Sequence, residues 1–333
     1  MSYQLKTQLA VTITASLMFA GFISSMIAWS SFELTVDHLY QFYFSFDSSS
    51  MEQQIIGTLR APRVYSAMLI GANLAVAGLL MQKLTSNALA SPSILGLNAG
   101  AACFMALSSV GFPVLASLPT LTVAALGAVS SGFLVLLLGG FFSKKPLPLK
   151  LVLAGIAINA LLVGLTRASV ILADDMAYSV IQWLAGSVSS IDAQQWHKLW
   201  PISVVGFALA LFNARSLNLF SLGSDVAISL GINVKRTQLL TCVAIILLTA
   251  SSVSIAGPIA FVGLIVPHIA APLIGQNLHV SIPFNALLGA TLLSWSDTIS
   301  RGVAFPAETP VGVITALIGT PIFIFLAARN KKI

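Results

Sequence analysis

The strongest constraint on the fold is a series of apolar segments, each about twenty residues long, that fills most of the chain. A bilayer core about 30 Å thick is crossed by roughly 20 residues of α-helix, so segments of this length predict transmembrane helices. About ten are present among the 333 residues, at 8–29, 62–82, 93–109, 114–142, 149–172, 197–213, 238–255, 258–274, 280–299 and 311–328. We therefore expect an all-α polytopic membrane protein.

The composition excludes several classes of protein. Only 8% of the residues are charged and 57% are hydrophobic, whereas soluble domains carry about 25% charged residues. A soluble enzyme, a disordered chain, a disulfide-stapled secreted domain and a nucleic-acid binder are all incompatible with these values. No linker divides the chain, so residues 1–333 are expected to form a single transmembrane domain.

The distribution of charge predicts the orientation of the chain. With ten spans, both ends lie on the same side of the membrane. If that side is the cytoplasm, most of the 16 Lys and Arg residues lie inside and most of the 10 Asp and Glu residues lie outside. This is the asymmetry that the positive-inside rule requires, so both termini are expected to be cytoplasmic.

Three connecting segments stand out from the short turns. Residues 31–59 form a long, aromatic-rich outer segment that we expect to lie along the membrane surface. Residues 176–190 contain a short amphipathic stretch, which predicts a short helix at the outer surface of the membrane. Residues 214–237 form a long inner loop with basic residues at both ends, and such a loop is either a docking surface or simply a solvated connection.

The chain carries no sign of an energy source of its own. It lacks the glycine-rich Walker loop that binds the phosphates of ATP, so no ATPase activity is expected. The central halves of its spans carry almost no ionisable residues, which disfavours an ion-coupled carrier. The helices are therefore expected to form a passive conduit.

A few polar residues within the spans are candidates for that conduit. Arg167 either faces the path of an anionic ligand or anchors its helix at the interface, where Asp174 and Asp175 would neutralise it. Asn73, Gln82 and Asn159 either line the path or form hydrogen bonds between helices.

Four segments together resemble one known family. They are Leu59-Arg60-Ala61-Pro62-Arg63, Asn87-Ala88-Leu89-Ala90-Ser91-Pro92, the segment 257–268 that ends in Val266-Pro267-His268, and Pro306-Ala307-Glu308-Thr309-Pro310. They resemble signatures of the iron–siderophore permease (FecCD) family of ABC importers, which includes the vitamin B12 permease. Ala88 departs from the pattern, because the family usually has proline there.

The resemblance implies a fold and a set of partners. It implies the type II fold of the vitamin B12 permease, in the bacterial inner membrane, with a second, non-identical permease subunit. Two ATPase subunits would bind ATP and Mg²⁺, and a periplasmic binding protein would deliver the cargo. This chain itself would bind no cofactor, metal or nucleic acid.

The resemblance also assigns residues. The ATPase-coupling residues would be Gly223, Ser224, Asp225, Ala227, Leu230 and Gly231, within the long inner loop. Arg60, Arg63 and Arg301 match arginines that receive acidic residues of the binding protein. The alternative for these arginines is an interfacial anchor to lipid headgroups.

Segments 164–167, 172–178 and 303–306 are similar to permeases for ferric dicitrate. Iron(III) dicitrate is therefore the expected cargo, and its negative charge suits Arg167. The alternatives are a hydroxamate or catecholate siderophore, or vitamin B12.

Overall fold

The computed structural model describes residues 3–140, 148–172 and 177–329. The described residues are helical and contain no strand. The main helices are α1 (Tyr3–Ile27), α4 (Ala61–Thr85), α5 (Leu97–Ser109), α7 (Thr120–Leu138), α8 (Pro148–Leu172), α10 (Ala193–Phe220), α12 (Val234–Ala256), α13 (Val262–Ile274), α14 (Leu278–Val303) and α15 (Val311–Arg329). Among the described residues, seven helices are long and apolar enough to cross a membrane, and three apolar helices are shorter. Each of the ten expected segments corresponds to one of these helices, so the all-α prediction is confirmed.

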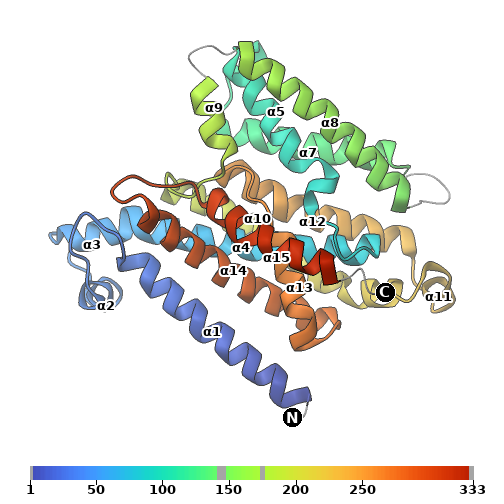
Figure 1. Ribbon diagram of the computed structural model, residues 1–333, viewed down its shortest axis with the longest axis horizontal. Helices are drawn as coiled ribbons and strands as arrows, with labels where there is room; N and C mark the ends of the chain where they lie inside the picture. Colours follow the sequence, from blue (N-terminus) through green and yellow to red (C-terminus); the bar gives the residue numbers. More distant parts are fainter. Residues whose placement is uncertain (1–2, 141–147, 173–176, 330–333) are drawn as a thin grey trace.

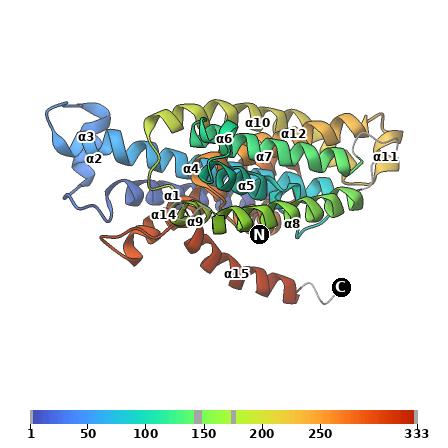
Figure 2. The same ribbon diagram turned by 90° about the horizontal axis from the view of Figure 1, so that it is seen from above.

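The shorter elements lie at the two ends of the molecule and between the long helices. They are α2 (Val36–Phe44), α3 (Met51–Ile55), a π-helical turn (Ile56–Arg60), a 3-10 turn (Pro92–Leu95), α6 (Pro113–Ala116), α9 (Ala177–Leu184) and α11 (Ser224–Ser229). In Figures 1 and 2, α2 and α3 lie at one end of the molecule and α11 at the other. The N-terminal end of α1 and the C-terminal end of α15 both point toward the α11 end.

Two connections are shorter than the sequence suggested. Residues 51–59 continue into α4 as one helical run, Met51–Thr85, so the outer surface segment ends near residue 50. Helix α10 continues to Phe220 and α12 begins at Val234, which narrows the inner loop to residues 221–233. Charged residues are good helix formers, so the loss of hydrophobicity does not end a helix. The start of α12 is set instead by the side chain of Asn233, which accepts a hydrogen bond from the backbone N–H of Arg236.

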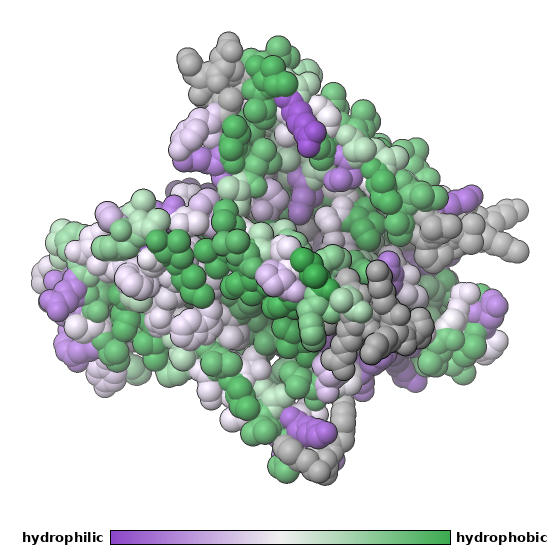
Figure 3. All heavy atoms as spheres, viewed as in Figure 1, coloured by the Kyte–Doolittle hydropathy of each residue, from purple (hydrophilic) through white to green (hydrophobic). Residues whose placement is uncertain are grey.

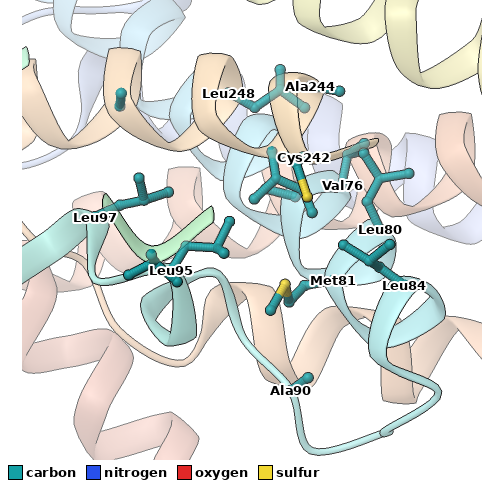
Figure 4. Close-up of a cluster of buried hydrophobic side chains, with 14 of the residues drawn as sticks. Val76, Leu80, Met81, Leu84, Ala90, Leu95, Leu97, Cys242, Ala244 and Leu248 are labelled. Atoms are coloured by element: carbon teal, nitrogen blue, oxygen red, sulfur yellow. The ribbon is translucent and has the colours of Figure 1, made fainter. Parts of the chain in front are cut away.

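Helix α4 is the central element of the fold. It packs against α14, α12, α13 and α10, while α5, α7 and α8 form a second group of mutually packed helices. Figure 1 shows this second group beside the bundle built around α4, with α12 in contact with both. Buried side chains of α4 and α12 join residues of the 85–97 connection in one apolar cluster, which includes Leu80, Met81, Leu95 and Leu248 (Figure 4).

Glycines allow the helices of this bundle to approach closely. A Cβ atom on Gly71 would lie 2.2 Å from the carbonyl oxygen of Gly289, and one on Gly78 would lie 1.8 Å from that of Gly263. Lipid tails are as apolar as leucine, so association of helices in a bilayer depends on such close packing.

The surface fits a membrane environment. Hydrophobic residues are spread over the face seen in Figure 3, and strongly hydrophilic ones lie mostly toward its edges. Large apolar side chains on α7 and α8, such as Phe133 and Leu161, are more than half exposed. In water this exposure would be costly, but hydrocarbon accommodates it.

The glycine contacts give a first prediction. Gly78→Ala places a methyl group against backbone that cannot rotate away, so α4 and α13 must separate. We expect the free energy of unfolding to fall by about 1–3 kcal/mol. Thermal unfolding of the purified protein in detergent measures this. Gly164→Ala on α8 is the matched control, because its Cβ would meet nothing within 4 Å. Equal midpoints for the two variants would contradict the packing argument.

Candidate functional site

The end of the molecule that carries α2 and α3 contains a buried cluster of charged residues. Arg63 of α4 donates from Nε and Nη2 to Oδ1 of Asp297 in α14, at 2.9 and 2.8 Å. The Asp297 side chain has no exposed surface. Its other oxygen, Oδ2, accepts from the hydroxyl of Ser25 in α1 at 2.9 Å and lies 3.2 Å from Nη2 of Arg301. One carboxylate therefore joins three helices.

Arg301 is the largest fully buried side chain in the described part of the protein. It donates to the backbone oxygens of Ser25 and Ala28 at 2.8 and 3.0 Å, and to the hydroxyl of Ser25 at 3.0 Å. A buried cation is tolerated in a span only when it is paired and hydrogen-bonded, and Arg301 meets both conditions.

Arg60 has a different environment from the other two arginines. Its side chain is half-buried, and its Nη2 donates to the backbone oxygen of Trp29 at 3.2 Å. Among the described residues it forms no ion pair. It lines a cavity of about 340 Å³ together with Arg63, Asp192 and Glu308.

The structure thus separates the three arginines that the sequence grouped for docking. Arg63 and Arg301 are 6% and 2% exposed and are held by internal partners, so in this structure they join helices. Arg60 is instead half-buried, and it lacks an ion pair among the described residues. The sequence reasoning missed Asp297 and Glu308 as partners of Arg63. Their signal was the presence of carboxylates in and beside an apolar span, where an unpaired charge is costly.

At the opposite end, α11 presents the residues expected to couple to an ATPase. Ala227 is fully buried, whereas Gly223, Ser224, Asp225, Leu230 and Gly231 are exposed. The helix and its C-cap residue also expose apolar side chains: Val226 is 46% exposed, Ile228 59% and the C-cap Leu230 56%. This helix lies between two spans and is too short to cross a membrane, so its apolar residues form a surface suited to a protein partner.

Of the four residues expected to line the path, two are exposed, one is half-buried and one is fully buried. Asn159 and Arg167 are exposed and lie eight residues apart on α8, which places them on one side of that helix. Asp174 and Asp175, which the sequence offered as neutralising partners of Arg167, lie outside the described residues.

Asn73 and Gln82 both bond between helices. Asn73 is fully buried and donates to the hydroxyls of Ser203 and Ser252, which places it between α4, α10 and α12. Gln82 is half-buried and donates to the backbone oxygen of Leu264 at 3.3 Å. It also lines a cavity of about 450 Å³ that includes His268. Interhelical bonding therefore accounts for the amide nitrogen of Asn73, while its buried Oδ1 has no hydrogen-bond partner among the described residues. Gln82 also reaches an open space.

Comparisons with known proteins agree with this architecture. The family model described as the FecCD transport family matches residues 16–329. The chain belongs to the FecCD transport family, which comprises ABC-type permeases for iron siderophores. It is 38% identical to the Fe(3+)-citrate import system permease protein YfmD of Bacillus subtilis, over 98% of this chain and 97% of that protein. It is 43% identical to the Fe(3+) dicitrate transport system permease protein FecC of Escherichia coli, over 84% of this chain and 85% of that protein.

A solved structure supports the fold of this FecCD member directly. It is a metal-chelate type ABC transporter in an inward-facing conformation, with a TM-score of 0.83 and 27% identity, and the match covers 97% of this chain and 99% of that one. The expected type II importer fold is therefore confirmed. With the apolar helices, this makes the chain a multi-pass membrane protein, and its relatives are permease subunits of importers.

The buried charges give a second prediction. Asp297→Asn removes the carboxylate charge between two buried guanidinium groups, and breaking a buried ion pair in this way costs about 3–5 kcal/mol. We expect thermal unfolding in detergent to occur at a clearly lower temperature. Asp192→Asn is the matched control, since Asp192 is exposed and caps α10, and asparagine caps equally well. An Asp297→Asn midpoint equal to that of Asp192→Asn would contradict the role of the cluster.

Proposed function

We propose that this chain is the membrane-spanning subunit of an ABC importer that moves iron(III) dicitrate from the periplasm to the cytoplasm of a bacterium. It would reside in the inner membrane with both termini cytoplasmic. The assignment of this cargo rests on the similarity, over most of both chains, to two permeases named for ferric citrate. The exposed cation Arg167 supports an anionic cargo, because a fixed positive charge raises the local concentration of anions.

A second permease subunit would complete the path. Asn159 and Arg167 lie among exposed apolar residues of α8 such as Ile156 and Leu165, so this side of the helix faces either lipid or protein. A cation is costly against lipid. A non-identical second subunit facing α8 would enclose these two polar side chains in a path between the subunits. Gln82, in the cavity nearer the α11 end, would lie further along the route.

Energy would come from partners. The sequence has no Walker loop, so we place ATP and Mg²⁺ on two ATPase subunits and no cofactor on this chain. The exposed side chains of Val226 and Ile228 on α11, with Leu230 at its C-cap, would bind in an ATPase groove. Buried Ala227 fixes α11 to the rest of the chain, so closure of the ATPases would push on α10 and α12 as rigid bodies.

The periplasmic binding protein would dock at the opposite end. Arg60 supports this, because its guanidinium is partly exposed beside an open cavity. It can donate two N–H groups to a carboxylate of the partner. Arg63 and Arg301 would support the docking surface from within. Replacing Arg63 by glutamate would place a third carboxylate beside Asp297 and Glu308 and disturb the buried cluster. A substitution of Arg60 therefore tests docking without this structural effect.

Uptake of radiolabelled iron in cells lacking this chain tests the cargo. Supplying the chain is expected to restore uptake of iron offered as citrate and not of iron offered as other siderophores. Arg167→Gln should lower citrate-dependent uptake about tenfold or more, the effect of losing roughly 1.4 kcal/mol of interaction with the anion.

Two variants control for loss of structure. Arg167→Lys retains the charge and should keep most of the uptake, and Lys198→Gln removes an exposed cation from α10 and should have little effect. Other relatives are named for hydroxamate, enterobactin and cobalamin import. Restored uptake of a hydroxamate or catecholate chelate, or of cobalamin, with none for citrate would assign that cargo instead.

The coupling surface has its own test. Ile228→Asp places a charge in the apolar surface of α11, and we expect co-purification of the ATPase subunits to fall at least tenfold at unchanged expression, as for a central interface residue worth about 2 kcal/mol. Val36→Asp also replaces an exposed apolar side chain by aspartate, but at the opposite end of the molecule. Val36 is 58% exposed, and its substitution should leave co-purification unchanged. Equal loss in both variants would contradict docking at α11.

A further inference from the structure

Arg63 holds two carboxylates in very different environments. On one edge, Nε and Nη2 bind fully buried Asp297. On the other edge, Nη1 donates to both oxygens of Glu308, at 2.8 and 3.0 Å, and the Glu308 side chain is 40% exposed. Exposed ion pairs are weak because water competes for both charges. The inner pair is therefore fixed, whereas the outer pair is open to exchange.

The outer pair lies where a partner carboxylate would enter. Glu308 and Arg63 line the same 340 Å³ cavity as Arg60. Among the described residues, Arg63 and Arg301 are paired with the carboxylates of Asp297 and Glu308, whereas Arg60 has no ion pair. Asp192 also lines the cavity, but its Oδ1 accepts a hydrogen bond from the backbone N–H of Gln195. Arg60 is therefore the group with which a further carboxylate would pair. If this carboxylate bound to both Arg60 and Arg63, it would lie beside the Glu308 carboxylate. The two negative charges would then repel each other.

Glu308 belongs to the connection between α14 and α15, residues 304–310, which is held by few contacts. Residues 303–308 are all exposed. Besides the Arg63–Glu308 pair, the contacts described for it are a ring contact of Phe305 with Trp29, a hydrogen bond from the Thr309 N–H to the Ser300 oxygen, and one from the Val313 N–H to the Pro310 oxygen. Loss of one ion pair therefore removes a substantial part of what holds this connection.

The connection leads directly into α15. Val311 begins that helix, and the next residue, Gly312, donates its N–H to the oxygen of Gly186 in the segment after α9. Helix α15 packs mainly against α14 and α13 and is less enclosed than α4. A displacement of residues 304–310 would thus act on the first turn of α15.

We propose that Glu308 is an internal placeholder on Arg63, displaced when a carboxylate of a docking protein binds Arg60 and Arg63, and that its release frees the α14–α15 connection at the start of α15. This rests on the proposed docking of the binding protein at Arg60. It assigns Glu308 two effects: it weakens docking by competing for Arg63, and it transmits docking to α15.

The first test measures affinity. The permease, assembled with its partner subunits in nanodiscs, is titrated with the purified binding protein of the same importer. Glu308→Gln keeps the shape and removes the competing charge, and we expect binding about fivefold tighter, the scale of one half-exposed ion pair. Glu33→Gln is the matched control: it makes the same change in a nearby exposed loop outside the cavity, and should alter binding less than twofold. Equal effects of the two variants, or no gain with Glu308→Gln, would overturn the placeholder.

The second test measures movement without depending on affinity. A spin label on Ala307→Cys, in a background where Cys103 and Cys242 remain buried, reports the mobility of the connection. In the wild-type background, mobility should rise when the binding protein is added. In Glu308→Gln it should be high already without that protein. A label equally immobile in both backgrounds, with and without the binding protein, would overturn the transmission.

Arg60→Gln separates the two levels of the argument. If it leaves binding unchanged, the proposed docking site is wrong. If it weakens binding while Glu308→Gln has no effect on binding or on mobility, docking stands and the placeholder is wrong.

Discussion

The structure depends on how closely α4 can approach its neighbours. Within a bilayer the backbone must form its own hydrogen bonds, which favours helices, but burial from water contributes little to holding one helix against another. Close contact between backbones holds the helices together instead. Gly71 allows α4 to contact α14 in this way, and Gly78 allows it to contact α13. The buried charges and Asn73 lie between α4 and the helices that pack against it.

Arginines that the sequence groups together lie in two different environments near the α2 and α3 end. Arg63 and Arg301 bind Asp297, so they stabilise the contact of α1, α4 and α14. Arg60, three residues before Arg63, remains available beside the cavity. A buried inner pair beneath an exchangeable outer pair would suit the proposed docking of a partner, since the outer contacts could change without breaking the inner one.

The fold was largely predictable because hydrophobic length is a local property. Each of the ten expected spans corresponds to a helix, and only their ends differ, as where α10 continues to Phe220. The site was less predictable because pairing is a property of distance in space. Asp297 lies 234 residues from Arg63 and Glu308 lies 245 residues from it, and no periodicity relates them. Asn73 shows the same limit: its serine partners are 130 and 179 residues away.

The sequence by itself determined that this chain is a helical membrane protein, which family its motifs match, and which loop carries the candidate coupling residues. Segment length, composition and short motifs are each written in neighbouring residues, and these conclusions need nothing else. Only the tertiary structure decided which polar residues are buried in pairs and which remain accessible. The cost of an unpaired charge in an apolar interior forces such pairing, but the partner is chosen by the crossing of helices that are far apart in the chain.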